Sequence, residues 1–170
     1  MRQAAVLVPL FRDRAGELRL VVVRRAAGGI HGGQLGFPGG KEDPEDASLR
    51  DTALREAREE IGLDGGVEIL DDLPVARTLT SGFAVAPFLA RIDLPAAWRL
   101  DEREIAQILE VRLADFARPA ARGREVKSFP TWPEPRWVPF YRVGEHKLWG
   151  LSYRIRKPLV PRLLAGEWEV

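Results

Sequence analysis

The segment GFPGGKEDPEDASLRDTALREAREEIGL, residues 36–63, predicts the best-defined helix of the chain, directly after a Phe-Pro-Gly-Gly turn. Ser48 stands at an N-cap position and Asp51 has capping-box spacing from it. Good helix formers follow through Glu60, and Gly62 provides a stop signal. The segment is therefore expected to form a helix that opens after the glycine-rich turn and ends at Gly62.

One side of this helix is apolar and the other is acidic. At about 100° per residue, the apolar side consists of Leu54, Ala57 and Ile61. The opposite arc is expected to carry Glu56, Glu59 and Glu60. Like charges four residues apart destabilise a bare helix by about 0.2–0.5 kcal/mol. Two explanations stay open: a solvated face balanced by Arg55 and Arg58, or a site for Mg²⁺ or Mn²⁺, which prefer carboxylate oxygens.

Apolar and β-branched runs predict the strands, and glycine or charged residues separate them. The expected strands are Ala4–Phe11, Leu18–Arg25, a third ending at Leu35–Phe37, Val67–Leu70, Val75–Leu79 and Phe83–Ile92. A second helix is expected over Asp101–Glu110, because Asp101 and Glu104 have capping-box spacing. The proline-rich segment around residues 130–139 is expected to be a loop. Residues 148–164 are helix-like, with Pro158 and Pro161 expected to interrupt the helix.

Composition excludes several classes of protein. A chain of 170 residues with 45% hydrophobic and 30% charged residues is long enough for a single domain over 1–170. No run reaches the roughly 18 apolar residues of a membrane span, and charged residues follow the short apolar start too soon for a signal peptide. A net charge of +1 gives no global field that attracts nucleic acid or an anionic membrane, so any attraction to phosphate must be local. The lack of cysteine excludes disulfides and thiolate metal sites, and fits the cytoplasm.

The run Arg55-Glu56-Ala57-Arg58-Glu59-Glu60-Ile61-Gly62-Leu63, preceded by Gly39-Gly40, resembles the signature of the Nudix hydrolases. This resemblance implies an α/β (α+β) fold in which a mixed sheet lies between helices. It also implies metal-dependent hydrolysis of a nucleoside diphosphate linked to another group, with Mg²⁺ or Mn²⁺ as cofactor. The implied metal site consists of Glu56, Glu59, Glu60 and the backbone of Gly40. Glu59 is in addition a catalytic candidate, and Arg55 is expected to hold an upstream acid and so fix the loop.

The spacing before the helix departs from the usual signature, because eight residues separate Asp46 from Arg55, where seven usually separate a glutamate from this arginine. This pattern resembles the coenzyme A pyrophosphatase branch, which has Phe-Pro-Gly-Gly, two spaced aspartates and Thr-Ala-Leu-Arg-Glu-Ala. Segments 31–36, 81–87 and 148–152 resemble further motifs of that branch. Gly29 stands where the branch commonly has an arginine, and Pro158 and Pro161 also depart from it.

The resemblance favours coenzyme A or an acyl-coenzyme A as substrate, cleaved to 4′-phosphopantetheine and adenosine 3′,5′-bisphosphate. Two alternatives remain open. The first is hydrolysis of ADP-ribose, a dinucleotide or a nucleoside triphosphate. The second is a non-catalytic domain that senses a nucleotide, although a binding module does not need a water-activating carboxylate cluster. The expected partner is a small nucleotide, with no nucleic acid and no membrane, and a homodimer is left open.

Further candidates have both a functional and a structural interpretation. Glu104 is a candidate general base or extra ligand, or it completes a helix cap. The candidate substrate-binding residues are Arg24, Arg25, His31, Gly39, Lys41 and Phe83. The charged ones among them also fit strand ends and loops. Four aromatic residues are candidates for stacking on a nucleobase: Trp132, Trp137, Phe140 and Tyr141. Their structural interpretation is packing of a loop or of a dimer contact.

Overall fold

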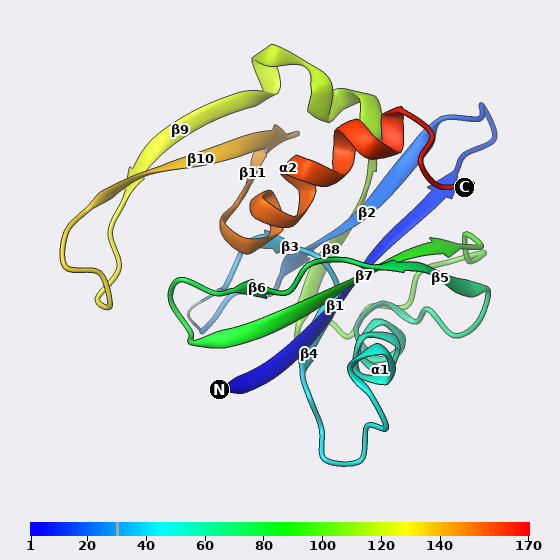
Figure 1. Ribbon diagram of the computed structural model, residues 1–170, viewed down its shortest axis with the longest axis horizontal. Coiled ribbons are helices and arrows are strands. Elements are labelled where there is room, and N and C mark those ends of the chain that lie inside the picture. Colours follow the sequence, from blue (N-terminus) through cyan, green and yellow to red (C-terminus); the bar gives the residue numbers. More distant parts are fainter. Residues whose placement is uncertain (30) are drawn as a thin grey trace.

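The computed structural model describes residues 1–29 and 31–170 and is built around strand β1 (Arg2–Arg12). Strand β7 (Phe83–Ile92) runs parallel to β1 along most of its length. On the other side, β1 pairs antiparallel with β2 (Leu18–Arg25) near its end and with β4 (Gly39–Lys41) near its start. Because β2 and β4 pair with the same edge of β1, the chain that leaves this edge at β2 comes back to it at β4 (Figure 1).

The outer strands complete this mixed sheet, which has eight strands within the described residues. These outer strands are β3 (Leu35–Gly36) and β8 (Ile105–Arg112), which pair with β2, and β5 (Val67–Asp72) and β6 (Ala76–Arg77), which pair with β7. A second sheet of the described residues consists of β9 (Arg122–Lys127), β10 (Arg136–Val143) and β11 (His146–Trp149). Short 3₁₀ turns at Leu113–Ala117 and Pro119–Ala121 connect the two sheets.

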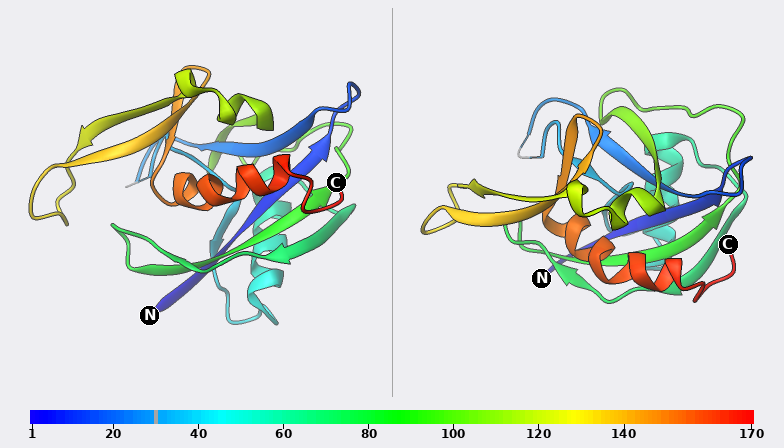
Figure 2. Two further views of the ribbon diagram at one scale, coloured as in Figure 1. Left: turned by 45° about the horizontal axis from the view of Figure 1, so that its top comes forward. Right: turned by 90° about the horizontal axis from the view of Figure 1, so that it is seen from above.

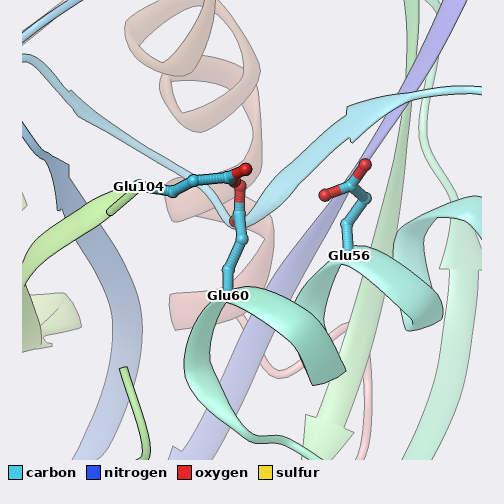
Figure 3. A group of neighbouring side chains, drawn as sticks. All are labelled: Glu56, Glu60 and Glu104. Carbon is cyan, nitrogen blue, oxygen red and sulfur yellow. The ribbon is translucent and has the colours of Figure 1, made fainter. Parts of the chain in front are cut away.

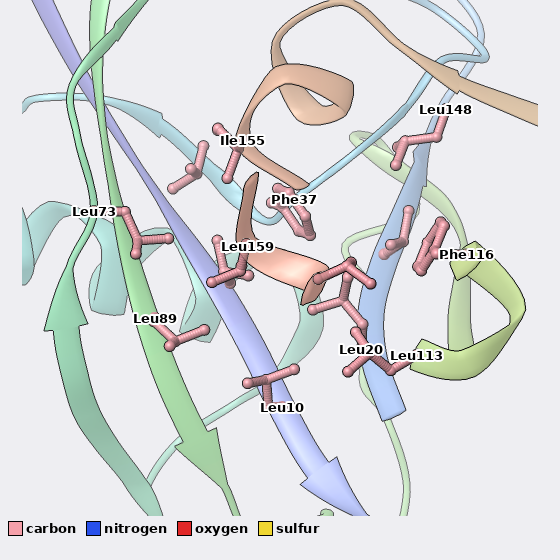
Figure 4. Packing of buried hydrophobic residues seen from close by; sticks show 14 of the residues in the cluster. Leu10, Leu20, Phe37, Leu73, Leu89, Leu113, Phe116, Leu148, Ile155 and Leu159 are labelled. Carbon is pink, nitrogen blue, oxygen red and sulfur yellow. The ribbon is translucent and has the colours of Figure 1, made fainter. Parts of the chain in front are cut away.

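Two helices cover opposite faces of the main sheet, α1 (Leu49–Ile61) and α2 (Gly150–Leu164), as Figure 2 shows from two directions. The alternation of side chains along β1 divides the core accordingly. The α1 side contains Ala5, Leu7, Ala53, Ala57 and Ile61. The α2 side contains Val6, Val8, Leu10, Ile155 and Leu159, part of the packing shown in Figure 4. The expected mixed sheet between helices is confirmed.

The boundaries of α1 agree with the sequence prediction. The Ser48 side chain accepts a hydrogen bond from the backbone N–H of Asp51, and its hydroxyl donates to the Asp51 carboxylate. Gly62 ends the helix in the left-handed region at φ 71°. Strands Leu18–Arg25 and Phe83–Ile92 also have the expected bounds. The expected strand Val75–Leu79 is reduced to Ala76–Arg77.

The helix expected over Asp101–Glu110 is wrong. A single turn closes at Asp101, whose carbonyl accepts hydrogen bonds from the N–H groups of Glu104 and Ile105, and strand β8 then begins. This strand pairs with β2 from Ile105 to Arg112. The β-branched residues of the segment favour a strand, and pairing with a neighbour that is distant in sequence overrides the local capping signal.

The proline-rich segment is only partly a loop. The residues between β9 and β10 form one, but Trp137, Pro139, Phe140 and Tyr141 belong to β10. Strand β11 pairs with β10 only from Phe140 to Val143, so no strand lies beside Pro139 on that side. A proline is tolerated there because its missing N–H breaks no ladder on the free side.

The expected interruption of the last helix is also wrong, since α2 continues through Pro158 and Pro161. Both prolines are exposed, whereas Leu159 and Val160 between them are buried. The carbonyl groups that lose a helical N–H donor therefore lie on the solvent side, where water can satisfy them. Packing of the buried face keeps the helix in register.

Among the described residues, no helix is both long and apolar enough to cross a membrane. Both helices pack on the same sheet, and the expectation of one domain over residues 1–170 stays a prediction.

Candidate active site

A group of carboxylates forms where α1 passes the start of β8. One carboxylate oxygen each of Glu56, Glu60 and Glu104 lies within 4.8 Å of the others, the arrangement shown in Figure 3. Glu56 and Glu60 come from successive turns of α1, and Glu104 comes from the turn that precedes β8. Grouped carboxylates repel one another unless a cation lies among them, and oxygen donors of this kind suit a hard divalent cation.

Glu60 is the most buried member of this carboxylate group, with only 2% of its side chain exposed. Its Oε2 accepts a hydrogen bond of 3.0 Å from the backbone N–H of Gly39, and its Oε1 lies 3.7 Å from Nη1 of Arg25. Burial raises the pKa of Glu60 to about 7, although Arg25 and the Gly39 N–H act in the opposite direction. A bound cation would remove this cost of burying the ionised form.

Glu56 is half-buried beside Glu60, and burial also raises its pKa, against the opposing effect of Arg55. Nη1 of Arg55 lies 3.2 Å from Oε1 of Glu56. A single guanidinium on one side leaves the remaining carboxylate oxygens available. The donor set of the described residues therefore fits a divalent cation that prefers oxygen ligands.

The glycine turn packs closely on both of its sides. A β-carbon on Gly39 would lie 2.2 Å from the carbonyl oxygen of Ala5, and one on Gly40 would lie 2.4 Å from Oε1 of Glu56. A side chain on Gly39 would meet backbone atoms of β1, so only glycine allows β4 to approach β1 there, whereas a side chain on Gly40 would displace the Glu56 carboxylate. Gly39 thereby contributes its N–H to the site, and the backbone of Gly40 borders the carboxylates.

Arg55 connects the helix to the preceding loop. Its Nε and Nη2 donate to the two Asp46 oxygens at 2.8 and 3.0 Å, and Nη2 also donates to the carbonyl of Lys41 at 3.0 Å. The Thr52 hydroxyl donates to the same carboxylate. The hydrogen bonds from Arg55 hold the pKa of Asp46 well below its usual range. Asp46 is thus the upstream acid that Arg55 was expected to hold, despite the shifted spacing.

Glu59 lies on the acidic arc of α1 with Glu56 and Glu60, but it does not belong to the carboxylate group of Glu56, Glu60 and Glu104. Its side chain is 58% exposed, and Nη1 of Arg55 lies 3.3 Å from its Oε2. Successive residues diverge by about 100°, so Glu60 lies at the buried side of this arc and Glu59 at its solvent side. The expected roles of Glu59 as ligand and catalytic residue stay predictions.

Glu104 belongs to the carboxylate group by its side chain and to the sheet by its backbone. Its carbonyl accepts a hydrogen bond of 2.8 Å from the N–H of Ala26, at the end of β2. The structural interpretation as a helix cap is wrong, because no helix begins at Asp101. Glu104 is the exposed member of the group, which leaves its carboxylate accessible to a substrate or water.

The candidate substrate-binding residues lie at different places. Arg25 and Gly39 contact Glu60, whereas Arg24 donates to the Gln107 side chain and His31 pairs with Gln34 at 3.2 Å in the loop after β2. Lys41 and Phe83 come together at the other end of the site, with Nζ of Lys41 5.8 Å from the centre of the Phe83 ring.

Arg2 joins Lys41 and Phe83, a contact that the sequence analysis missed. Its guanidinium carbon lies 4.4 Å from the centre of the Phe83 ring. The parallel pairing of β1 with β7 places Arg2 opposite Phe83. Nothing local to either segment indicates this pairing, so no sequence signal could have identified the contact.

The four aromatic candidates for base stacking separate into different environments. Phe140 and Tyr141 are each 3% exposed, which leaves no ring face for a base. Trp137 is 63% exposed and is covered by Arg124 at 5.0 Å. Trp132 packs edge-on to Phe129, which stacks on Trp149 at a centroid distance of 5.5 Å. Trp149 and Phe129 were not among the sequence candidates.

Sequence comparison gives a consistent identification. The sequence model of the NUDIX domain matches residues 1–147. A Citrobacter koseri protein named "Uncharacterized Nudix hydrolase NudL" is 35% identical over 160 residues, which cover 93% of this chain and 81% of that protein. The protein of the same name from Salmonella newport is 35% identical over 164 residues, with the same coverage.

Solved structures of the same fold include a binary complex of the Caenorhabditis elegans Ap4A hydrolase, with a TM-score of 0.56 and 22% identity over 68% of this chain and 82% of that chain. The NUDIX domain of Shewanella oneidensis NrtR, complexed with ADP ribose, gives a TM-score of 0.54 and 20% identity over 66% of this chain and 73% of that chain. At these identities the likeness establishes the fold. With the NUDIX model and the NudL relatives, it shows that the chain belongs to the Nudix hydrolase family.

Proposed function

We propose that this Nudix hydrolase cleaves the diphosphate bond of coenzyme A or an acyl-coenzyme A, releasing 4′-phosphopantetheine and adenosine 3′,5′-bisphosphate. Its family acts on nucleoside diphosphate derivatives, and the proposal concerns which derivative. The observation that carries it is the contact between Arg55 and Asp46. Asp46 has the spacing of the coenzyme A pyrophosphatase branch, and the contact gives this spacing a structural role beside the carboxylates.

A second observation supports the same branch. The segment before Phe37 and the Trp149-Gly150 motif both resemble that branch, and they lie far apart in sequence. They meet in space, since a β-carbon on Gly36 would lie 3.5 Å from the hydroxyl oxygen of Ser152. Both segments therefore border the Arg25–Glu60 pair rather than lying on separate surfaces.

Nudix hydrolases generally use divalent cations, and we infer that Mg²⁺ or Mn²⁺ is held here by Glu56 and Glu60, with Glu59, Glu104 and the Gly40 backbone as further candidate ligands. When bound, the cation supplies charge neutralisation for the diphosphate and lowers the pKa of a coordinated water. The chain's own residues orient the reaction. Arg55 holds the loop that carries Gly39 and Gly40 against α1.

Glu104 is the candidate general base, because its exposed carboxylate lies at the mouth of the carboxylate group. A carboxylate in that place can remove a proton from the attacking water and release it to solvent. Glu59 is the alternative base, at the solvent side of α1. We infer that Lys41 and Arg2, which both contact the Phe83 ring, bind a part of the substrate beyond the diphosphate.

ADP-ribose is the second candidate substrate. The NrtR NUDIX domain, which shares this fold, was solved with ADP ribose. That protein shares 20% of its residues with this chain over the matched region, so the comparison supports the alternative only through the fold. A non-catalytic sensor is the third candidate, and the carboxylate group argues against it because nucleotide binding alone does not require it.

Product release tests these candidates. Purified protein with Mg²⁺ or Mn²⁺ is incubated with coenzyme A, acetyl-coenzyme A, ADP-ribose, NADH, diadenosine polyphosphates and nucleoside triphosphates, and products are identified by chromatography and mass spectrometry. Fastest appearance of 4′-phosphopantetheine supports the proposal. Faster cleavage of ADP-ribose or another diphosphate overturns the coenzyme A assignment, and binding without any product supports a sensor.

The proposal extends to location and assembly. A chain without cysteine fits the reducing cytoplasm, where a nucleotide-hydrolysing enzyme would meet its substrate. The exposed pair of Trp137 and Val126 on β10 and β9 is a candidate contact for a homodimer. Sedimentation of the wild type and a Trp137→Ser variant tests this, and a monomeric wild type would overturn it.

A further inference from the structure

The start of helix α2 borders the carboxylate group at Gly36 of strand β3. A β-carbon on Gly36 would lie 3.5 Å from Oγ of Ser152 and 3.9 Å from Nη2 of Arg25. Nη1 of the same arginine lies 3.7 Å from Glu60. A hydroxyl and a guanidinium therefore face one small space next to the acid that we assign to the cation.

The polar groups around this space have unused hydrogen-bonding capacity. Ser152 is only 9% exposed, and its hydroxyl has no hydrogen-bond partner among residues 1–29 and 31–170. The guanidinium of Arg25 also makes no hydrogen bond within those residues, beyond its ion pair with Glu60. Among the described residues, the fully buried side-chain atoms without a partner belong to Arg156, so the Ser152 hydroxyl retains contact with solvent and is accessible to a ligand.

Helix α2 adds further donors, because its first turn is open. The residue before it, Trp149, provides no side-chain cap, and the helix begins at Gly150. The N–H groups of the first turn have no acceptors inside the helix, and the helix dipole favours negative charge at this end. Ser152 belongs to this turn, so its hydroxyl and the amides lie at the same end of the helix.

This set of groups selects an anion over a neutral or cationic ligand. Guanidinium, hydroxyl and amide N–H groups all donate, and the acid beside them, Glu60, is engaged when a cation is bound. A nucleobase presents donors as well as acceptors and would leave some of its own groups unpaired here. A phosphate monoester presents only acceptors and two negative charges, which matches the site.

We propose that Arg25, Ser152 and the first turn of α2 bind a phosphate on the ribose of the substrate, separate from the diphosphate that is cleaved. This inference rests on the proposed function, in which the diphosphate is held at Glu56 and Glu60. A ribose links the two anionic groups in a 3′-phosphorylated nucleotide, and the Arg25–Glu60 contact links their two binding places in the protein. The site therefore distinguishes coenzyme A from ADP-ribose, which lacks this phosphate.

Binding of the nucleotide product tests the site without depending on turnover. Calorimetric titration with Mg²⁺ present compares adenosine 3′,5′-bisphosphate with 5′-AMP. The expected result is binding of the bisphosphate at least about 10-fold tighter, in the range of one charge-assisted hydrogen bond. Equal affinities overturn the inference.

Two variants locate the effect. Ser152→Ala removes the hydroxyl, and we expect it to reduce the preference for the bisphosphate about 5-fold. Gly36→Ala fills the space itself; its methyl group meets Ser152 at an ordinary contact distance, so folding is retained while the phosphate is displaced. Ser128→Ala, at an exposed position on the β9–β10 loop, is the matched control. Retention of the full preference by Gly36→Ala contradicts the assignment.

Turnover measurements then distinguish a failure of this inference from a failure of the proposed function. The wild type is expected to cleave coenzyme A with a higher kcat/KM than 3′-dephospho-coenzyme A, and Ser152→Ala is expected to raise KM for coenzyme A alone. Equal cleavage of both overturns the phosphate site and leaves the proposed function standing. Preferential binding of the bisphosphate without cleavage of either compound supports the site and overturns the proposed function.

Discussion

The two helices of this Nudix hydrolase meet the site in opposite ways. Helix α1 is closed at its start by Ser48 and at its end by Gly62, and it presents side chains from its middle, Glu56 and Glu60. Helix α2 has no side-chain cap at its start and presents that end to the site, through Ser152. The closed helix supplies negative charge for a cation, and the open helix supplies donors for an anion.

The helices also differ in what maintains them. Local capping signals define α1, whereas α2 contains Pro158 and Pro161 and a buried Arg156. The guanidinium carbon of Arg156 lies 3.3 Å from the centre of the Tyr141 ring, and its Nε and Nη1 have no hydrogen-bond partner among the described residues. Burial lowers the pKa of this arginine. Contacts with the second sheet, formed by β9, β10 and β11, thus maintain α2 against unfavourable local signals.

The largest expected effect is on the closed helix. Glu60→Gln is expected to lower kcat by at least about 100-fold, equal to about 2.7 kcal/mol, because the amide cannot replace the most buried carboxylate of the cation site. The unfolding temperature without metal serves as the control. It should be no lower than that of the wild type, because the substitution removes a charge from the interior. Near-full activity would remove Glu60 from the ligand set.

Removal of the cation is the next prediction. Because the cation binds only the folded carboxylate group, a concentration of 100 Kd should stabilise the protein by about 2.7 kcal/mol, and chelation should abolish turnover. Thermal unfolding with EDTA, Mg²⁺ and Mn²⁺ measures the shift. The shift should disappear in Glu60→Gln; an equal shift in that variant would place the cation elsewhere.

Substitution of Arg55 tests whether catalysis requires the contact that holds the loop before α1. Arg55→Lys keeps the charge but loses the paired hydrogen bonds to Asp46, and we expect kcat/KM to fall about 10-fold or more. A double-mutant cycle with Asp46→Asn measures the coupling. Independent, additive effects of the two substitutions would show that the contact does not support catalysis.

The smallest effects are expected from two substitutions that compare the helix starts directly. Ser48→Ala removes the cap of α1 and should lower the free energy of unfolding by about 1 kcal/mol without changing substrate preference. Ser152→Ala should change stability by less than about 0.5 kcal/mol and alter substrate preference. Chemical denaturation and the kcat/KM ratio of coenzyme A to 3′-dephospho-coenzyme A measure both. A change of substrate preference in Ser48→Ala, with only a loss of stability in Ser152→Ala, would refute the distinction between a closed and an open helix start.

The sequence predicted what local signals determine. The bounds of α1 follow from Ser48 and Gly62, and the contact of Arg55 with an upstream acid follows from the family pattern. The strand at Ile105–Arg112 could not be predicted, because its pairing with β2 depends on tertiary structure. Glu104 lies in the carboxylate group and its catalytic role stays a prediction, whereas the helix assigned to it was wrong.

The anion site could not be predicted either, because its parts lie on different elements. Arg25, Gly36 and Ser152 belong to β2, β3 and α2, which come together only in the folded chain. The same holds for Arg2 beside Phe83, which depends on the parallel pairing of β1 with β7. Sequence patterns identified the segments, and the fold determined which of their residues meet.

A crystal structure with Mn²⁺ and adenosine 3′,5′-bisphosphate is the most direct test of the division between the two helices. Anomalous scattering should locate manganese among Glu56, Glu60 and Glu104, and the 3′-phosphate should lie against Arg25 and Ser152 at the start of α2. Manganese outside that carboxylate group, or a 3′-phosphate in solvent away from α2, would contradict the account.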